Sequence, residues 1–365
     1  MHVFGSTNRG GAEMRTLELM RAVDRTRVET EFCALSGQVG SLTDEIVTLG
    51  GAVHPCKLDL GFGPRFVRLI RERAIDVVHS HVYLTSGLIL AVARVAGVRH
   101  RIAHFRSTSD GRRDTIGRRG YRGLMRQLLD RNATDILGVS EGSLRAAWSP
   151  RWADDPRCRV IYGGVDPARF EVPDAAASIR AELGLAPSTP LVVQVGRFDP
   201  PKNHPFAADI VAALPADIHV VFVGRGGTAL ELETRRRLRA HGAAARAHFV
   251  GERIDVPRWL VGADVSILPS VLEGLPGAVL ESLAAGTPVV ASSLSGVREI
   301  AARLPGITQR RVDDSPARWA EAITTALRAP PTAASRAASR ATFAASPFAL
   351  PVSAAAHSAL WTRGG

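Results

Sequence analysis

Residues 269–291 read PSVLEGLPGAVLESLAAGTPVVA, and the apolar run at 265–268 directly before them is typical of a buried strand. Pro276 suits the first turn of a helix, where its missing N–H costs nothing. We expect this helix to end at Ala285, with Gly286 in the left-handed conformation and a strand at 288–291. The stretch therefore predicts a strand–loop–helix–strand unit of an α/β protein.

Two carboxylates belong to this unit. Glu273 lies in the loop before the predicted helix, and Glu281 lies on its second turn. A helix N-terminus at the carboxyl end of a parallel strand is where α/β proteins receive anionic ligands. A ligand there would meet backbone donors together with two glutamates. This combination suits a molecule that carries both phosphates and sugar hydroxyls.

Strand and helix patterns alternate along the rest of the chain. Strand patterns recur at 2–4, 29–35, 52–54, 76–81, 101–104, 136–139 and 159–161, and again at 190–195, 219–223 and 247–250. Such alternation predicts parallel, doubly wound sheets. The 365 residues also exceed what one hydrophobic core usually serves. We expect an α/β fold with two Rossmann-like domains facing a cleft.

The domain boundaries follow from where these two series begin and end. We place an N-terminal domain at 1–163 and a C-terminal, ligand-binding domain at 164–345. The Ala/Ser/Arg-rich run up to Ser346 has little pattern, and it is compatible with either a helix or a linker. The last segment, 346–365, is expected to pack back on the first domain.

The net charge of +11 raises the question whether the protein binds nucleic acid. The chain has only two lysines, Lys57 and Lys202, so nearly all its basic residues are arginine, as a genome with GC-rich codons would produce. Aromatic residues are only 5% and are not interleaved with the basic ones for base stacking. We therefore expect no nucleic-acid partner.

The cysteine content and the hydropathy of the chain indicate the cellular compartment in which the protein is expected. The three cysteines, Cys33, Cys56 and Cys158, lack the spacing of a metal site, and a reducing environment fits them best. No apolar run reaches the roughly 18–20 residues that span a bilayer, and the N-terminus does not resemble a signal peptide. We expect a cytoplasmic protein, peripheral on the inner face of the plasma membrane.

The segment from Arg101 to Arg131 holds nine arginines against three aspartates. One interpretation is a solvated face. The other is a basic surface for anionic lipid or for a polyprenyl-phosphate acceptor.

Two glycine- or cation-containing loops follow predicted strands. Gly10 and Gly11 join the first strand to a helix, the layout of a turn that approaches phosphate, although a plain turn has the same pattern. Arg197 and Lys202 flank a loop in the second half. Cations beside a diphosphate stabilise the negative charge of a leaving group. Lysine is rare in this chain, so its use at position 202 indicates a need for a compact ammonium in place of a guanidinium. A solvated loop pair is the alternative.

Later loops are less informative. Gly224-Arg-Gly-Gly227 and the loop with Arg253 and Ile254 each end a strand and could border a nucleotide base. A plain loop explains either of them equally well.

Histidines cluster at the ends of two strands in the first half. His79 and His81 have strand spacing and face one side, but the sequence offers no third metal ligand beside them. A structural or cleft-lining role is therefore favoured over a metal site. His104 and Arg106 end the next strand and are better placed to touch a substrate.

The residues together resemble the retaining glycosyltransferases of family 4. The matching motifs are Gly10-Gly-Ala-Glu13, Asp76-Val-Val-His-Ser-His81, Val160-Ile-Tyr-Gly-Gly-Val-Asp166, Gly196-Arg197 with Lys202, Glu273 to Glu281, and Gly296-Val-Arg-Glu-Ile300. They cover about residues 1–310 in order. Residues 79–84 and 103–109 resemble the bacterial exopolysaccharide subgroup.

The resemblance implies a GT-B fold in which the N-terminal domain, 1–163, binds the acceptor and the C-terminal domain, 164–345, binds the nucleotide sugar. It also implies a role for each matched residue. Arg197 and Lys202 would hold the diphosphate of a nucleotide-sugar donor and stabilise its departure. Glu273 would bind hydroxyls of the donor sugar, and Glu281 those of the ribose. The donor would also meet backbone or side-chain groups of Gly10, Gly11, Arg253, Ile254, Leu275 and Gly277.

The family's cleft histidine aligns either with His104 or with the position of Arg106. We assign His104 to the catalytic group, with Arg197, Lys202 and Glu273. His79, His81 and Arg106 are assigned to the acceptor side or the cleft lining. In the family's pattern Asn stands where this chain has Gly163.

The expected function is transfer of a sugar from a UDP- or GDP-sugar to a glycan or polyprenyl-diphosphate-linked acceptor. Retention of anomeric configuration, no metal and no further cofactor are implied, and so is a place in exopolysaccharide or cell-envelope glycan synthesis. The alternatives are a nucleotide-sugar epimerase or hydrolase on the same fold, and a degenerate GT-B scaffold acting as a binding protein. A nicotinamide enzyme is disfavoured because the Gly-x-Gly-x-x-Gly pattern is missing.

Overall fold

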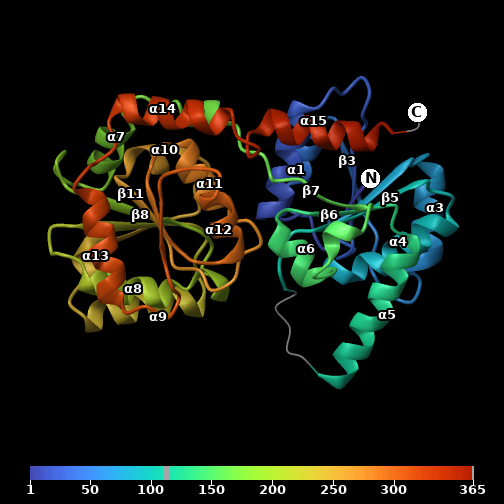
Figure 1. Cartoon of the computed structure of the whole chain (residues 1–365), viewed down its shortest axis with the longest axis horizontal. Helices are drawn as coiled ribbons and strands as arrows, with labels where there is room; N and C mark the ends of the chain where they lie inside the picture. The colour runs from blue at the N-terminus through green and yellow to red at the C-terminus, as the bar shows by residue number, and fades with distance from the viewer. Residues whose placement is uncertain (110–114, 364–365) are drawn as a thin grey trace. The chain divides into compact units, whose positions relative to one another are not determined.

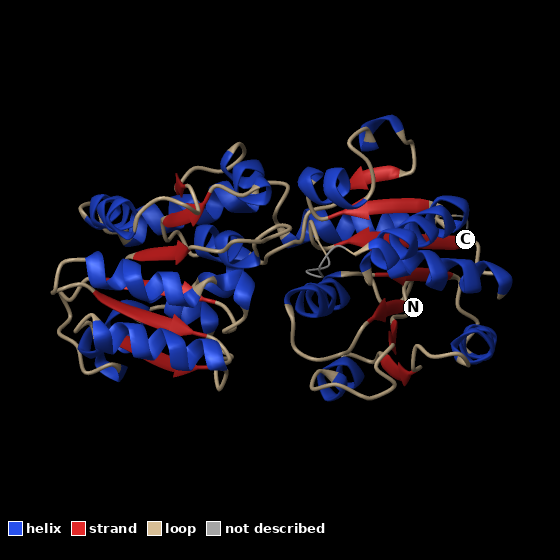
Figure 2. Cartoon of the chain, turned by 90° about the horizontal axis from the view of Figure 1, so that it is seen from below, coloured by secondary structure: helices blue, strands red, loops and turns tan. Residues whose placement is uncertain are grey.

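Two compact units make up the computed structural model, which describes residues 1–109 and 115–363. The first unit comprises Met1–Gly164 and Leu350–Gly365, and the second comprises Val165–Ala349. The predicted boundaries, at 163/164 and 345/346, lie within four residues of these. Each unit has a parallel sheet between layers of helices (Figures 1 and 2).

The first unit has a seven-stranded parallel sheet in the order β3-β2-β1-β4-β5-β6-β7. Its strands are β1 (His2–Phe4), β2 (Glu31–Ala34), β3 (Ala52–Pro55), β4 (Val77–Ser80), β5 (His100–Phe105), β6 (Asp135–Gly138) and β7 (Cys158–Val160). The strand order reverses between β1 and β4. Such a switch point, at the carboxyl ends of the strands, is where open α/β sheets bind ligands.

Helices cover both faces of this sheet. They are α1 (Gly11–Ala22), α2 (Thr43–Thr48), α3 (Phe62–Glu72), α4 (Ser86–Val95), α5 (Ile116–Asn132), α6 (Glu141–Ala147) and α15 (Leu350–Trp361), with short 3-10 helices η1 (Tyr83–Thr85) and η2 (Trp152–Asp154). The α3–α6 face holds a core that includes Phe66, Ile89 and Leu129. On the other face, α1 packs beside α15 through Leu19 and Leu350 (Figure 1).

The second unit repeats this architecture with six parallel strands in the order β10-β9-β8-β11-β12-β13. The strands are β8 (Leu191–Val195), β9 (His219–Val223), β10 (Ala247–Gly251), β11 (Val265–Leu268), β12 (Val289–Ser292) and β13 (Ile307–Arg310). The helices are α7 (Ala175–Glu182), α8 (His204–Ala213), α9 (Ala229–Ala240), α10 (Val256–Gly262), α11 (Gly277–Ala284), α12 (Ser295–Ala301), α13 (Pro316–Leu327) and α14 (Ala333–Ala344), with η3 (Pro167–Phe170), η4 (Pro200–Lys202) and η5 (Ala244–Arg246). Here the order reverses between β8 and β11.

The stretch 269–291 forms the predicted loop, helix and strand. The helix α11 begins at Gly277, directly after Pro276, and ends at Ala284. Gly286 has φ +69, as predicted, and a Cβ there would lie 2.6 Å from the Cα of Arg336. Glycine is therefore required twice over, by the left-handed turn and by the close approach of α14.

The Ala/Ser/Arg-rich run is a helix rather than a linker. Its N-terminus has a capping box in which Thr332 and Ser335 satisfy each other's backbone amides. Arg336 is buried and donates to the carbonyl oxygens of Ala285 at 3.1 Å and Ala263 at 2.7 Å. The buried Arg336 therefore anchors α14, through a hydrogen bond, to the loop that follows α11.

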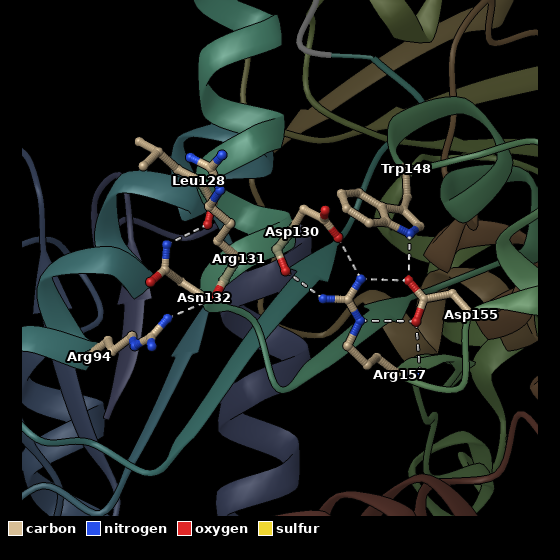
Figure 3. A network of polar contacts seen from close by, with 8 residues as sticks. All are labelled: Arg94, Leu128, Asp130, Arg131, Asn132, Trp148, Asp155 and Arg157. Carbon is tan, nitrogen blue, oxygen red and sulfur yellow. Dashed lines mark hydrogen bonds and ion pairs between the residues drawn. The ribbon is translucent and has the colours of Figure 1, made fainter.

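The C-terminal end of α5 is anchored by a polar network (Figure 3). Arg157 donates to the carbonyl oxygen of Asp130 at 2.6 Å and to its carboxylate at 2.7 Å. The same guanidinium pairs with Asp155, which also accepts from the indole of Trp148 at 3.2 Å. These contacts hold the Asp155 carboxyl pKa below its ordinary value, chiefly through the hydrogen bonds from Arg157. The network makes this end of α5 a structural part of the first unit.

Within the described residues, no helix combines the length and the hydropathy that crossing a membrane requires.

Candidate functional site

Two loops of the second unit meet at the carboxyl ends of β8 and β11. The ammonium nitrogen of Lys202 lies 2.7 Å from Oε1 of Glu273, and the two side chains are 23% and 14% exposed. Asn203, at φ 55, donates its side-chain amide to the carbonyl oxygen of Pro269 at 3.1 Å. The amide of Val271 donates to the carbonyl of Pro201 at 2.9 Å. The structure therefore brings two of the predicted site residues together on a rigid pair of loops.

Arg197, the second predicted cation, lies in the same loop but points elsewhere. Its guanidinium pairs with Asp199 at 2.9 Å, and half of its side chain is exposed. A Cβ on Gly196 would lie 3.1 Å from Cδ of Lys202, so the lysine chain lies across this glycine. Gly196 thus leaves room for Lys202.

The loop that carries Glu273 is packed against α12. A Cβ on Gly296 would lie 2.2 Å from the carbonyl oxygen of Gly274, so only glycine permits this contact. Leu275 and Gly277, predicted to face a ligand, lie directly around Pro276 at the start of α11 and are partly exposed. Glu281 lies on the second turn of the same helix.

Arg253 and Ile254 follow β10. The Arg253 guanidinium is engaged by Asp255 at 2.9 Å and by Glu182 at 3.3 Å. Ile254 is 90% exposed. Of these two predicted ligand contacts, Ile254 is free to form an apolar contact, whereas Arg253 already has carboxylate partners.

His204 is a buried residue of this site that the sequence reasoning missed. Its ring stacks on Phe198 with centroids 3.9 Å apart, and neither ring nitrogen has a hydrogen-bond partner among the residues that the structure describes. Burial, with Lys202 nearby, lowers the pKa of His204 to about 4. His204 is therefore neutral, and the cations of this loop are Lys202 and Arg197. The only sequence signal for His204 is its place two residues after Lys202. A histidine at the start of a helix is a weak indication of a functional role.

In the first unit, the turn with Gly10 and Gly11 leads into α1 at the carboxyl end of β1. A Cβ on Gly10 would lie 2.4 Å from a carboxylate oxygen of Glu13, so this side chain folds over the glycine. Around Gly11 the space is open.

Five histidines form a layer between the sheet and α15. This histidine layer consists of His2, His79, His81, His104 and His357, all of them buried except His81, which is partly exposed. His2 pairs with His79 across β1 and β4, which the sequence reasoning did not foresee because 77 positions separate them. His104 is predicted as catalytic, and the structure places it in this layer, stacked on His79 with centroids 5.2 Å apart.

Donor-only groups assign the tautomers of two of these rings. The indole N–H of Trp361 donates to Nδ1 of His79 at 3.2 Å, and Nε of Arg106 donates to Nδ1 of His81 at 3.2 Å. Both Nδ1 atoms therefore carry lone pairs, and both Nε2 atoms carry protons. Nε2 of His79 faces Nδ1 of His104 at 3.0 Å, and Nε2 of His81 faces Nδ1 of His2 at 3.0 Å.

This hydrogen-bond direction bears on metal binding. Ligand atoms of His2, His79 and His81 lie within 4.8 Å of one another, and His2 supplies the third ligand that the sequence lacked. A metal-bound histidine needs one lone pair toward the ion and normally donates its other N–H to an acceptor. In His79 and His81 the Nδ1 lone pair already accepts from Trp361 or Arg106, and Nε2 carries the proton, so neither ring has a free lone pair for an ion. The residues present do not fit a bound cation, and the expectation that no metal is held stays a prediction.

Burial keeps the layer neutral. It lowers the pKa of His2, His79, His81 and His104 well below 6.5, with further lowering by neighbouring charged or titrating groups. The pKa of His357 falls to about 4 for the same reason.

Comparisons with known proteins agree with these motifs. The family model described as "Glycosyltransferase Family 4" matches residues 9–169, and "Glycosyl transferases group 1" matches residues 189–329. The Staphylococcus aureus "Capsular polysaccharide biosynthesis glycosyltransferase CapH" is 30% identical over 306 residues, which cover 82% of each chain. This chain belongs to glycosyltransferase family 4.

This glycosyltransferase is similar to a further curated relative, and it shares its fold with two solved structures. The Bacillus subtilis (strain 168) "Putative glycosyltransferase EpsF" is 28% identical over 339 residues, covering 90% of this chain and 88% of the relative. The Anabaena protein Alr3699/HepE, crystallised in complex with UDP, has a TM-score of 0.81 at 18% identity, with 98% of each chain covered. WaaG, a glycosyltransferase involved in lipopolysaccharide biosynthesis, has a TM-score of 0.74 at 15% identity, with 100% and 99% covered.

These findings confirm the predicted family, the GT-B fold and a glycosyltransferase of the polysaccharide-biosynthesis type. In this glycosyltransferase the second unit presents a cation and a carboxylate at one sheet edge. A cation there can neutralise a phosphate, and a carboxylate can accept from sugar hydroxyls. The roles of the individual residues stay predictions.

Proposed function

We propose that this glycosyltransferase transfers a hexosyl group from a UDP- or GDP-sugar to a glycan or polyprenyl-diphosphate-linked acceptor, with retention of anomeric configuration. The observation that carries the proposal is the pairing of Lys202 with Glu273 at the carboxyl ends of β8 and β11. The similarity to CapH supports a place in capsular or exopolysaccharide synthesis. The HepE structures with UDP and with UDP-glucose support a nucleotide-sugar donor.

In the proposed reaction, the bond between C1 of the donor sugar and the β-phosphate oxygen breaks, and its electron pair leaves with the diphosphate. Lys202 and Arg197 stabilise the charge that develops on this leaving group. An acceptor hydroxyl forms the new bond to C1 on the same face, and its proton passes to the departing phosphate oxygen. Glu273 binds sugar hydroxyls and is not the nucleophile. His104 remains the proposed histidine of the catalytic group.

The remaining proposed contacts lie around these two loops. Glu281 accepts from the ribose hydroxyls, and the amides of Leu275 and Gly277 face the donor, since Pro276 has no N–H. Ile254 and Arg253 border the base. Gly10 and Gly11 approach a phosphate, and His79 and His81 remain proposed for the acceptor side. The reaction needs no metal or further cofactor, because the cations supply the charge stabilisation.

The test is to incubate the protein with UDP-glucose, UDP-galactose, UDP-N-acetylglucosamine and GDP-mannose. Nucleotide release is followed with and without a short-chain polyprenyl-diphosphate sugar. We expect release from at least one donor that rises with the acceptor, and an NMR spectrum of the product that shows retained configuration. An inverted product would disprove retention. No turnover of any donor by folded protein would disprove the proposed donor class.

The same assay separates the alternatives. A nucleotide-sugar epimerase or hydrolase would consume the donor equally fast without an acceptor. A degenerate scaffold would show no turnover, and its biological activity would survive Lys202→Ala and Glu273→Ala.

We further propose that α5 contacts the anionic inner face of the plasma membrane. The helix carries five arginines and one aspartate, and its apolar Ile116 and Leu124 are 86% and 53% exposed. Its N-terminal turns project beyond the neighbouring helices of the first unit (Figure 1). Basic residues attract anionic lipid, and exposed apolar side chains can insert at the interface. Residues 110–114 of the predicted basic segment lie outside the described residues.

Vesicle sedimentation tests this contact. We expect binding to phosphatidylglycerol-containing vesicles and little binding to pure phosphatidylcholine. Each arginine near the surface contributes about 1 kcal/mol, so Arg119→Glu with Arg126→Glu should weaken binding by at least about tenfold. Reversing Arg68 and Arg71 on α3 is the matched control. Equal loss in the control would indicate a non-specific charge effect and contradict a role for α5.

A further inference from the structure

Arg106 has an unusual environment at the carboxyl end of β5. Its Nε donates to Nδ1 of His81 at 3.2 Å, whereas its Nη2 is buried and has no hydrogen-bond partner among the described residues. A guanidinium offers five N–H donors in a planar fork, and a buried donor without an acceptor is costly. A missing acceptor beside a buried cation indicates an anionic ligand.

The direction of this side chain is set by two histidines. Because Arg106 can only donate, His81 accepts at Nδ1 and carries its proton on Nε2. That proton points to Nδ1 of His2 at 3.0 Å. The His81 ring is further fixed by stacking on Phe4, with centroids 4.3 Å apart at 7°. His81 therefore holds the guanidinium in one orientation.

His104 lies on β5, two residues before Arg106, but its surroundings differ from those of Arg106. Nδ1 of His104 accepts from His79, and its ring stacks on His357 of α15 with centroids 5.9 Å apart. Nε2 of His104 is buried and lacks a partner within the described residues. His104 lies in the histidine layer under α15, whereas Arg106, directly after β5, carries the charge that an oxyanion can neutralise.

The Arg106 guanidinium stays charged although it is buried, and it has charged neighbours of both signs. Glu13 attracts the guanidinium and Arg15 repels it, while burial lowers its pKa to about 10, so it remains charged. Glu13 folds over Gly10 at the start of α1, and Arg15 donates to the carbonyl oxygen of Gly164 at 3.3 Å. Arg15 thus has a partner of its own in the first unit.

We propose that Arg106 binds an oxyanion of the acceptor through its buried Nη2, and that His81 is the positioning residue for this contact. The inference rests on the proposed function, in which the first unit binds the acceptor. It assigns the acceptor to an acidic class, with a phosphate or carboxylate group close to the hydroxyl that is glycosylated. Both groups match the planar guanidinium fork.

The test measures binding by calorimetry, without turnover. The phosphate arm compares a short-chain polyprenyl-diphosphate N-acetylglucosamine with free N-acetylglucosamine. The carboxylate arm compares a glucuronic-acid-terminated disaccharide with its glucose-terminated counterpart. We expect the wild type to prefer one acidic probe by at least about tenfold over its neutral counterpart, a typical effect of one charge-assisted contact.

Variants decide whether Arg106 provides this preference. Arg106→Gln should abolish it, and Arg106→Lys should retain part of it. The matched control is Arg99→Gln, an exposed arginine before the opposite end of β5, which should bind like the wild type. His81→Leu should lose the preference and His81→Gln should restore it, since a glutamine carbonyl can accept from Nε. Failure of His81→Gln to restore it would overturn the positioning role.

UDP affinity is recorded for every variant, because the nucleotide is proposed to bind the second unit. A wild type that does not bind UDP would contradict the proposed function itself. UDP binding together with an unchanged preference in Arg106→Gln, or with no preference in the wild type, would overturn the inference alone.

Discussion

Lys202 and Glu273 lie 71 positions apart in the chain, yet their charged atoms are 2.7 Å apart. Both side chains are largely shielded from water, so salt screens this pair less than an ordinary surface ion pair. It holds the lysine extended across Gly196 before any ligand arrives. Lys202 is one of only two lysines in the chain, and a compact ammonium suits its place over this glycine.

Replacing Lys202 should remove much of the charge stabilisation at the leaving group. We expect Lys202→Ala to lower kcat/KM by about 100- to 1,000-fold, the usual effect of losing one such donor. Lys202→Arg should recover little, since the planar fork does not fit the same space. Steady-state kinetics with the preferred donor give the measurement. Lys57→Ala, at the chain's other lysine, is the control, and a similar loss there would argue against a specific role.

Some residues of the site could be predicted one by one, and others could not. Lys202, Glu273 and Gly286 had local signals: a rare residue type, a loop before a helix, and a helix end. His2 had none and His204 had only its place beside Lys202, because their importance comes from neighbours on other strands or loops. His104 and Arg106 could not be told apart, since two alternate positions of one strand differ only in what packs on them.

At the scale of elements, the histidine layer couples α15 to the sheet in a pH-dependent way. The folded-state pKa of these rings lies below that of free histidine, so the unfolded chain binds more protons. Stability is therefore full above about pH 6.5 and falls as the pH decreases toward the folded-state pKa. For His357 this window extends down to about pH 4.

The pH dependence can be measured on one ring. Each histidine can remove up to about 1.4 kcal/mol of unfolding free energy per pH unit in this window, or about 3 kcal/mol for His357. We expect His357→Gln to flatten the fall of stability between pH 6.5 and 4 in urea titrations. His100→Gln, outside the layer, should leave the slope unchanged. Identical slopes for His357→Gln and wild type would contradict the coupling.

The helix α14 depends on one buried side chain. Arg336 donates to two carbonyl oxygens and to Oγ1 of Thr287, and burial lowers its pKa to about 10. Arg336→Ala would leave these acceptors buried and unpaired. We expect a loss of about 2–4 kcal/mol of unfolding free energy, measured by denaturant titration. The exposed Arg328 provides the control, since Arg328→Ala should change stability by less than about 0.5 kcal/mol.

For the whole molecule, the last helix belongs to the first unit although the second unit precedes it in the chain. It buries Leu350, Ala354, His357 and Leu360 and places Trp361 against His79. Each large apolar side chain contributes about 1.5–3 kcal/mol of stability when buried. The first unit is therefore completed by the end of the chain.

Deleting residues 350–365 should remove about 5 kcal/mol from the first unit, most of a typical domain's stability. We expect calorimetry to show loss of one thermal transition, with the transition of the second unit retained. Deleting only residues 363–365 removes the ion pair of the described Arg363 with Asp135 and should have little effect. Two intact transitions in the longer deletion would show that α15 is dispensable.

The sequence by itself determined the secondary structure and the fold class. Strand β11, helix α11 and strand β12 were predictable to within a residue or two, because hydrogen bonding within a helix, proline and glycine geometry and buried runs are local properties. Repetition of that pattern, with the family motifs in order, was enough to predict the GT-B fold. The glutamates, Lys202 and the glycines could be proposed as site residues on the same grounds.

Only the tertiary structure decided which side chains meet. The layer of five histidines, the anchoring of α14 by Arg336 and the contact of Trp361 with His79, 282 positions away, have no local signal. Their partners are chosen by how sheets and helices pack, and packing brings together residues from any part of the chain. The orientation of Arg106 depends in the same way on His81, since a hydrogen bond between two strands fixes it.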